Sequence, residues 1–212
     1  MKKILCYGDS NTFGYNPKDT TRFNEKMRWT GILRDNFLNE YEVIEEGLNN
    51  RTGFVDNPDG FNHSGLKHFP KFIENLNDIE IITIALGTND LQAQFDIDFL
   101  TIENNLITLI GYAKKKTKNI IIIPPVVFDK RLLKGRCGYQ YDKNGILKSR
   151  QLPTLYRNIA IKNKCEYIDF NEFVTVSDDD GLHYDAIAHS IIAKKMTGFI
   201  KEKYLKNNLV RK

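Results

Sequence analysis

The segment IEIITIALGTND, residues 79–90, decides the fold of this chain because it joins two features of a parallel sheet. Its first eight residues are almost continuously apolar and rich in β-branched side chains, as expected for a strand that helices cover on both faces. Its last four residues are small and polar, and ligands of open parallel sheets bind just beyond the carboxyl ends of the strands. The segment therefore predicts a buried strand that ends at a functional site.

Strands and helices alternate along the rest of the chain. Short runs rich in β-branched or aromatic residues predict further strands at residues 3–7, 41–45, 119–124 and 165–170. Apolar residues at helical spacing predict helices within residues 29–38, 99–110 and 187–200. Such alternation is typical of β-α-β units with right-handed crossovers. We expect one domain over residues 1–212: a three-layer α/β/α, flavodoxin-like fold around a parallel five-stranded sheet.

Residues 126–147 form the one long stretch without a clear strand or helix pattern, and they include three glycines. Long loops in compact domains tend to be functional or mobile. Two interpretations stay open. The segment arches over the site or takes part in an oligomer contact, or it is a surface excursion without a role.

The composition is that of an ordinary globular protein. Of the 212 residues, 41% are hydrophobic and 27% are charged, and the net charge is +4. Much of the basic excess lies at residues 114–116 and in the C-terminal tail, without interleaved aromatics or a binding motif, so we expect solvated surface and no nucleic-acid partner. No apolar run approaches the ~20 residues that span a bilayer. The apolar stretch at residues 4–7 is too short for a signal peptide, and we expect a cytoplasmic protein without a membrane partner.

Four polar turns follow predicted strands and should meet at one edge of the sheet. They are GDSN at residues 8–11, GLNNRTG at residues 47–53, GTND at residues 87–90 and DGLH at residues 180–183. The last turn lies just before the final predicted helix. The chemistry of the protein is therefore expected at this edge.

The turns contain the groups that a hydroxyl nucleophile requires. Ser10 lies at a strand-to-helix turn, where backbone amides and the helix dipole favour negative charge. His183 can take and return the Ser10 proton, and Asp180 can reach the other ring nitrogen across a single turn. Asn89 offers a side-chain amide to a developing oxyanion. Together these residues predict acyl transfer through a serine nucleophile.

The four turns resemble the SGNH, or GDSL-type, hydrolase family. Residues 8–11 are similar to the first block of that family, residues 87–90 match its third block, and Asp180-x-x-His183 matches its last. A closer likeness to the arylesterase and acyltransferase branch covers most of the chain, in RWTGIL at residues 28–33, EEGL at 45–48, RT at 51–52 and PP at 124–125. Residues 126–147 carry little of this likeness.

The resemblance implies a role for each site residue. The family's nucleophile, aspartate and histidine fall on Ser10, Asp180 and His183. Its oxyanion is held by backbone amides that correspond to Ser10 and Asn50 and by the side chain of Asn89. The resembling branch commonly forms oligomers that narrow the pocket, so a homo-oligomer is implied as well.

Two positions depart from the family pattern. Asn50 stands where the second block usually has glycine; asparagine tolerates left-handed backbone angles, and its side chain bears on the width of the pocket. Asn11 stands where the common form of the first block has leucine, which changes packing or polarity beside the nucleophile.

Several candidate residues also have structural explanations. Taken alone, Ser10 is better explained as a helix N-cap. Catalysis is favoured only because Asn89 and Asp180-x-x-His183 are also present. We interpret Asp9 and Asp90 as acceptors for loop amides and leave them out of the catalytic set. Three aromatic residues line an acyl or leaving-group pocket in one interpretation and the core in the other: Phe13, Tyr15 and Trp29.

The other histidines have weaker claims to chemistry. His63 and His68, near the start of a helix, are interpreted as surface or capping residues, and His189 as a packed or surface residue of the last helix. Imidazole and carboxylate are metal ligands, so His183, His189 and the acidic run at residues 178–180 form a possible metal site. The acidic run is better explained as a loop that orients His183. The odd number of well-separated cysteines argues against a disulfide framework or a zinc site.

The sequence thus predicts a serine esterase that hydrolyses small carboxylic esters, or transfers their acyl group to an alcohol, without metal or organic cofactor. A carbohydrate O-deacetylase is an alternative, because the same family framework removes acetyl groups from sugars. A non-catalytic flavodoxin-like module that binds a flavin or a partner protein is an alternative of another class. Against that module, the chain has no phosphate-binding loop of the G-x-G-x-x-G or Walker type.

Overall fold

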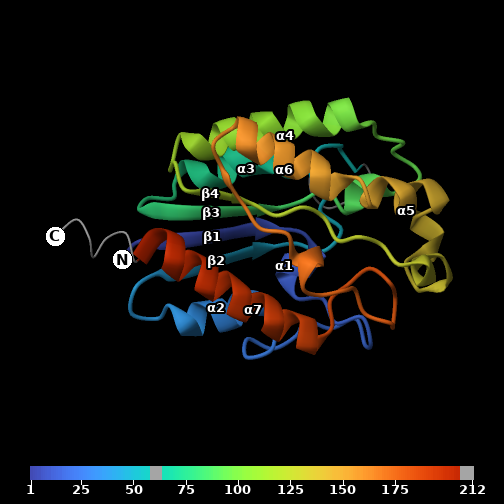
Figure 1. Ribbon diagram of the computed structural model, residues 1–212, viewed down its shortest axis with the longest axis horizontal. Helices are drawn as coiled ribbons and strands as arrows, with labels where there is room; N and C mark the ends of the chain where they lie inside the picture. The colour runs from blue at the N-terminus through green and yellow to red at the C-terminus, as the bar shows by residue number, and fades with distance from the viewer. Residues whose placement is uncertain (58–63, 206–212) are drawn as a thin grey trace.

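A computed structural model describes residues 1–57 and 64–205, and its centre is one parallel sheet (Figure 1). The strands are β1 (Lys3–Gly8), β2 (Glu42–Gly47), β3 (Ile79–Ala85), β4 (Ile120–Ile122) and β5 (Glu166–Tyr167). They lie in the order β2-β1-β3-β4-β5, and every neighbouring pair is parallel. This is the flavodoxin-like order, and the predicted fold class is confirmed.

Helices cover both faces of the sheet (Figure 1). On one face lie α2 (Trp29–Asn36) and α7 (Ala186–Ile200), and on the other lie α3 (Gly65–Glu74), α4 (Phe99–Lys114) and α6 (Leu152–Lys162). The periodicity of the sequence predicts α2, α4 and α7, whereas α6 is missing from the predicted elements. Within the part of the chain that the structure describes, no helix is long and apolar enough to cross a membrane.

The central strands are fully buried, as the apolar run at residues 79–86 predicts. Ile81, Ile82 and Ile84 of β3 have no exposed surface, and neither do Ile4 and Leu5 of β1. Burial of one such side chain contributes about 1.5–3 kcal/mol. Together these side chains anchor the two strands whose ends carry the first and third polar turns.

The lysine cluster at residues 114–116 lies at the end of α4. Lys114 and Lys115 are exposed, as predicted for a solvated face. Lys116 instead donates hydrogen bonds to the carbonyl oxygens of Glu74 and Leu76, so it closes the C-terminal end of α3. The end of the basic tail, residues 206–212, lies outside the described residues.

Residues 126–147 are not irregular throughout, and that expectation was wrong. They contain short 3-10 turns at Lys130–Lys134 and Gly138–Gln140 and most of α5 (Lys143–Ser149). Asp129 and Asp142 begin the first turn and α5, because each carboxylate accepts a backbone N–H two or three residues later. In this segment, the sequence signal for the helical turns was therefore an aspartate N-cap rather than apolar residues at helical spacing.

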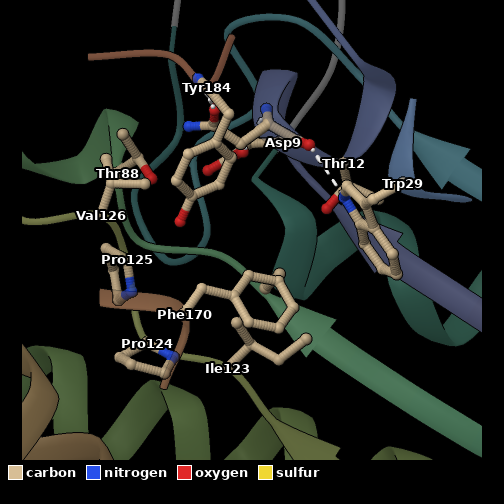
Figure 2. A pocket seen from close by; sticks show the side chains of 12 residues that line it. Asp9, Thr12, Trp29, Thr88, Ile123, Pro124, Pro125, Val126, Phe170 and Tyr184 are labelled. Atoms are coloured by element: carbon tan, nitrogen blue, oxygen red, sulfur yellow. Dashed lines mark hydrogen bonds between the residues drawn. The ribbon is translucent and has the colours of Figure 1, made fainter. Parts of the chain in front are cut away.

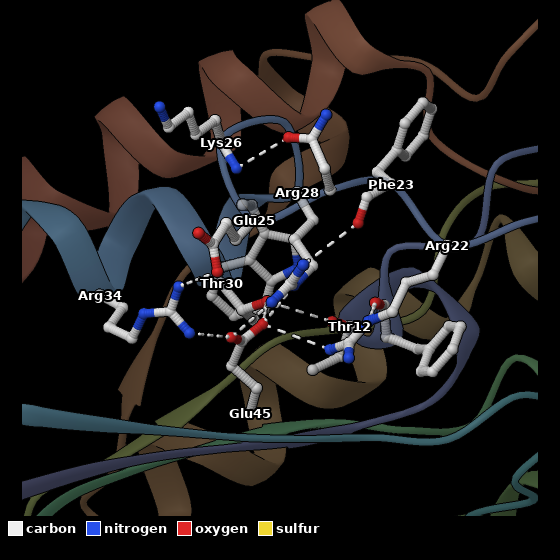
Figure 3. A network of polar contacts seen from close by, with 12 residues as sticks. Thr12, Arg22, Phe23, Glu25, Lys26, Arg28, Thr30, Arg34 and Glu45 are labelled. Atoms are coloured by element: carbon white, nitrogen blue, oxygen red, sulfur yellow. Dashed lines mark hydrogen bonds and ion pairs between the residues drawn. The ribbon is translucent and has the colours of Figure 1, made fainter.

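A charged cluster around Glu45 of β2 braces the start of α2 and the turn after β1 (Figure 3). The Glu45 carboxylate accepts hydrogen bonds from four side chains: Arg22, Arg28, Thr30 and Arg34. Arg22 also donates to the carbonyl oxygen of Phe13 at 2.7 Å. Burial raises the pKa of Glu45, but the bonds from Arg28 and Thr30 and the arginine charges outweigh it, and the pKa lies below its ordinary value. Glu45 is therefore ionised at neutral pH.

Candidate active site

Ser10 follows β1 directly and begins the short helix α1 (Ser10–Phe13). Asp9 is the N-cap, and its carboxylate accepts a backbone N–H two residues later at 2.9 Å. Gly8 has no room for a side chain, because a Cβ there would lie 2.0 Å from the Thr12 hydroxyl. This tight turn places Ser10 at the carboxyl edge of the sheet, with 5% of the residue exposed.

The side chains of Ser10, His183 and Asp180 form one hydrogen-bonded row. Ser10 Oγ lies 2.9 Å from His183 Nε2, and His183 Nδ1 lies 2.6 Å from Asp180 Oδ2. All three residues are buried. With its proton on Nδ1, facing the carboxylate, the imidazole presents Nε2 as an acceptor to the hydroxyl.

Asp180 is fixed to its own turn as well as to the imidazole. Its Oδ1 accepts the backbone N–H groups of Leu182 and His183, both at 2.9 Å. Burial raises the pKa of Asp180, but the hydrogen bond and charge of His183 and these backbone bonds outweigh it, and the pKa lies below its ordinary value. The group that faces His183 is therefore a carboxylate at neutral pH.

Asn11, which departs from the first-block pattern, joins the nucleophile turn (residues 8–11) to the histidine loop (residues 180–183). Its Nδ2 donates to the carbonyl oxygen of Leu182 at 3.3 Å, and its Oδ1 accepts the N–H of Tyr184 at 3.1 Å. These two bonds flank His183 on both sides in the sequence. A leucine at this position would leave both backbone groups without these partners.

The segment of residues 126–147 packs against the histidine loop and hydrogen-bonds to it. The N–H of Asp129 donates to the carbonyl oxygen of Gly181 at 3.1 Å, and Arg131 pairs with Asp178. Gly181 has a φ of +72°, and a Cβ there would lie 2.6 Å from the Leu132 nitrogen, so the close approach requires glycine. Of the two interpretations of this segment, the one that places it at the site fits these contacts.

The three aromatic candidates have different surroundings. Tyr15 lies against His183, with 4.3 Å between ring centroids and 39° between ring planes. Trp29 is buried in the core, and its Nε1 donates to the Asn11 carbonyl at 3.0 Å. The ring of Phe13 carries the Arg22 guanidinium 4.5 Å from its centroid. Only Tyr15 of the three contacts the row of polar side chains.

Asn89 and Asn50 approach the same edge from two further turns. Asn89 begins the 3-10 turn Asn89–Leu91 after β3, and its Nδ2 donates to the Arg51 carbonyl at 3.0 Å. Asn50 follows β2 with a φ of +58°, the left-handed geometry that asparagine tolerates. The Asn50 side chain is exposed, and its Oδ1 accepts a hydrogen bond from Gln92 at 2.8 Å.

Two residues at this edge are absent from the predicted site. Tyr141 donates its hydroxyl to Asn89 Oδ1 at 3.2 Å, and Gln92 Nε2 lies 3.4 Å from the same oxygen. No motif marks Tyr141, which comes from the segment that carries little family likeness. Gln92 lies two residues beyond the third block, at the end of the turn Asn89–Leu91, and this position was the one available signal.

Asp9 and Asp90 are structural acceptors, as predicted. The Asp90 carboxylate accepts the N–H groups of Gly53, Phe54 and Val55 at 2.5, 2.7 and 3.1 Å, which ties the turn after β3 to the turn after β2. Burial raises the pKa of Asp90 to about 6, against the effect of these backbone bonds. Burial likewise raises the pKa of Asp9.

Of the remaining histidines, His68 and His189 do not join the site. His68 is half-buried rather than a capping residue: α3 turns its ring toward the sheet, where Nδ1 lies 3.1 Å from the Tyr7 hydroxyl. His189 is packed and fully buried, and its Nδ1 accepts the backbone N–H of Trp29 at 3.3 Å. His63 lies outside the described residues. Among residues 1–57 and 64–205, no group of three or more potential ligands is arranged to hold a metal.

A cavity of about 20 Å³ lies behind the nucleophile turn (Figure 2). It lies between Asp9 and Trp29 on one side and Thr88, Phe170 and Tyr184 on the other. Its volume suits one water molecule and is too small for an acyl group. A substrate must therefore reach Ser10 from another side.

The comparisons with known proteins agree with the geometry of this site. It matches the GDSL-like lipase/acylhydrolase family over residues 4–196. No curated protein matches its sequence. Among solved structures, the native aryl esterase of M. smegmatis is similar with a TM-score of 0.87 and 25% identity, over 95% of this chain and 99% of that one.

Two further structures share the fold. Est24, a carbohydrate acetylesterase from Sinorhizobium meliloti, has a TM-score of 0.87 and 24% identity, over 96% of this chain and 100% of that one. The lipase/acylhydrolase from Enterococcus faecalis has a TM-score of 0.71 and 22% identity, over 96% and 97%. The family match covers all four polar turns and leaves no support for a non-catalytic binding module. The chain therefore belongs to the GDSL-like lipase/acylhydrolase family and is a carboxylic ester hydrolase.

Proposed function

We propose that the protein cleaves small carboxylic esters through an acyl-Ser10 intermediate and passes the acyl group to water or to an alcohol. The observation that carries this proposal is the hydrogen-bonded row of Ser10, His183 and Asp180, with distances of 2.9 and 2.6 Å. A hydroxyl, a base and an orienting carboxylate in that order are the groups that acyl transfer to serine requires.

In the first step, Ser10 Oγ attacks the ester carbonyl carbon while His183 Nε2 takes the hydroxyl proton. The tetrahedral oxyanion accepts hydrogen bonds from the backbone N–H groups of Ser10 and Asn50 and from the side chain of Asn89. The C–O bond to the alcohol then breaks, and His183 gives its proton to the departing oxygen. Acyl-Ser10 remains.

In the second step, His183 takes a proton from water or from an acceptor alcohol, whose oxygen attacks the acyl carbon. The bond to Ser10 Oγ breaks, and Ser10 recovers its proton from His183. Asp180 remains a carboxylate throughout, because its pKa is lowered, and it stabilises the imidazolium that forms in each step.

The side chain of Asn89 suits an oxyanion donor. Its NH2 group carries two hydrogens, and the bond to the Arg51 carbonyl uses one of them. Asn89 is buried, so its amide acts in surroundings where electrostatic interactions are stronger than in water. Loss of one such donor lowers turnover by roughly 10²–10³-fold.

A fluorophosphonate probe tests the nucleophile. We expect Ser10→Ala to abolish both probe labelling and ester hydrolysis while the thermal midpoint stays within about 2 °C, because only the hydroxyl oxygen is lost and the Asp9 cap on the Asn11 N–H is undisturbed. Ser149→Ala, at a fully buried serine outside the row of Ser10, His183 and Asp180, is the control, and this variant should still be labelled at Ser10. Labelling that persists in Ser10→Ala would contradict the assignment.

An acetylated saccharide is a second candidate substrate, favoured by the amide groups beside the proposed oxyanion donors. Asn50 and Gln94 are exposed there, and amides hydrogen-bond well to sugar hydroxyls. A panel of p-nitrophenyl acetate, longer acyl esters and acetylated saccharides separates the candidates. A higher kcat/KM for the saccharides than for the simple acetate would favour the deacetylase.

A further inference from the structure

We propose that Gln92 is a positioning residue that fixes two of the three proposed oxyanion donors, the backbone N–H of Asn50 and the side-chain amide of Asn89. The inference rests on the proposed function, because it assigns Gln92 to the same oxyanion site. Gln92 follows the turn Asn89–Leu91 and is only 1% exposed. A buried amide of this kind needs hydrogen-bond partners, and its partners show what it does.

The amide of Gln92 connects two turns that come from different strands. Its Nε2 donates to Asn50 Oδ1 at 2.8 Å and lies 3.4 Å from Asn89 Oδ1. Its Oε1 accepts a hydrogen bond from Gln94 at 3.1 Å. The bond to Asn50 is the shortest of the three and crosses from the turn after β3 to the turn after β2.

Asn50 needs such an anchor because of its backbone. A φ of +58° is uncommon for any residue other than glycine, and a residue stays there only where its surroundings hold it. The direction of the Asn50 N–H depends on this φ, and so does the direction of its Cα–Cβ bond. A hydrogen bond that fixes the side chain therefore also fixes the donor proposed for the oxyanion.

Asn89 is held by the same group of side chains. Its Oδ1 faces two donors, the Tyr141 hydroxyl at 3.2 Å and Gln92 Nε2, while its Nδ2 bonds to the Arg51 carbonyl. Rotation of the amide by half a turn would bring its NH2 group against both donors and its oxygen against a carbonyl. These contacts thus determine which end of Asn89 carries the hydrogens.

A packing role for Gln92 makes a different prediction from a positioning role. Methionine has nearly the shape of glutamine but offers no amide, so Gln92→Met keeps the volume and removes the hydrogen bonds. If Gln92 only fills space, Gln92→Met changes little. If it aligns the donors, the loss appears in the transition state, where the oxyanion forms, and not in the binding of the ester.

The experiment measures p-nitrophenyl acetate hydrolysis with active sites counted by fluorophosphonate titration, so that misfolded protein does not enter kcat. We expect Gln92→Met to lower kcat about tenfold with KM within about twofold. The affinity for a trifluoromethyl ketone, whose adduct with serine carries an oxyanion, should fall by a similar factor of about ten. Unchanged kcat and ketone affinity would overturn the proposal.

Two further variants separate positioning from general damage. Gln151→Met makes the same change at an amide outside the site, which donates to the Leu147 carbonyl oxygen at 3.4 Å, and both kinetic constants should stay within about twofold. Asn50→Gly keeps the left-handed backbone without strain but removes the acceptor, so Gln92→Met should cost clearly less in that background than in the wild type. Equal losses in both backgrounds would show that Gln92 does not act through Asn50.

The outcome is distinct from a failure of the proposed function. If Ser10→Ala keeps its labelling and hydrolysis, the acyl-serine mechanism fails and the Gln92 inference falls with it. If Ser10→Ala is inactive and Gln92→Met behaves like the wild type, the mechanism stands and only the positioning role is refuted.

Discussion

His183 and His189 lie close together in the sequence and are almost equally buried, yet their surroundings differ. His183 has Asp180 on one ring nitrogen and Ser10 on the other. His189 Nδ1 accepts the backbone N–H of Trp29, and His189 Nε2 has no hydrogen-bond partner among the described residues. Burial and the charges of His183 and Arg28 lower the pKa of His189 to about 3. A buried histidine without a carboxylate partner is thus a neutral core residue, and a general base additionally requires a carboxylate that stabilises its protonated form.

The largest expected effect comes from removal of that carboxylate. Asp180→Asn keeps an oxygen that accepts the backbone N–H groups of its turn, but it no longer selects the imidazole tautomer or stabilises the imidazolium. We expect kcat for p-nitrophenyl acetate to fall by about 10⁴-fold. The exposed neighbour Asp179 provides the control, and Asp179→Asn should keep kcat within about threefold. An Asp180→Asn enzyme within tenfold of the wild type would remove Asp180 from the mechanism.

The pH dependence of stability tests the other side of the comparison. Because the folded pKa of His189 lies below its ordinary value of 6.5, the unfolded state binds the proton first, and stability is lost as the pH falls below 6.5. The difference between 6.5 and about 3 corresponds to about 5 kcal/mol at pH 3, as an order of magnitude.

Urea unfolding between pH 7 and pH 4 measures this effect. In His189→Gln, the glutamine can still accept the backbone N–H of Trp29 but does not titrate. The stability of this variant should therefore fall less steeply than that of the wild type as the pH is lowered. Parallel curves for the two proteins would show that His189 is not the group responsible for acid sensitivity.

A smaller effect is expected where Asn11 fastens the histidine loop to the nucleophile turn. Asn11→Ala removes two hydrogen bonds, and we expect the free energy of unfolding to fall by about 2 kcal/mol and kcat by about tenfold. Asn36 joins α2 to Thr197 of α7 through a similar amide at 3.0 Å, away from the site. Asn36→Ala should lower stability without a comparable loss of kcat. A loss of stability alone in Asn11→Ala would mean that the loop keeps its place without Asn11.

The smallest expected effect concerns the ring beside His183. The Tyr15 ring packs against the imidazole of His183 and helps to hold its orientation, and such ring pairs are worth about 0.5–1.5 kcal/mol. Tyr15→Leu should therefore lower kcat about twofold to fivefold. Phe13→Leu changes a ring that contacts Arg22 instead and should not change kcat. Equal losses in both variants would point to a general disturbance of the turn.

Much of the fold was predictable because its signals are local. The continuous apolar run of β3 and the helical spacing in α2, α4 and α7 each occur within one element. Sequence reasoning missed α6, although Leu152, Tyr156 and Ile159 have helical spacing and are fully buried. It also missed the capped turns after Asp129 and Asp142, because a short capped turn buries too little apolar surface to show periodicity.

The candidate site was predictable only in part. Ser10 and Asn89 lie in short motifs at strand ends, and Asp180 and His183 lie in the motif before α7, so the order of the elements brings them toward one edge. The contact of His68 with Tyr7 was missed because it depends on how α3 is rotated against the sheet. Gln92 and Tyr141 were missed because their relevance lies in contacts with residues far away in the sequence.

The sequence by itself determined the fold class and the edge at which the polar turns gather, because parallel β-α-β units with right-handed crossovers leave few arrangements for such a pattern. Only the tertiary structure decided which side chains support the reactive ones: Asn11 beside the histidine loop, Gln92 between the two asparagines, and His189 without a carboxylate. The physical reason is that a hydrogen bond depends on a few tenths of an ångström and on direction, which emerge only when all elements pack together.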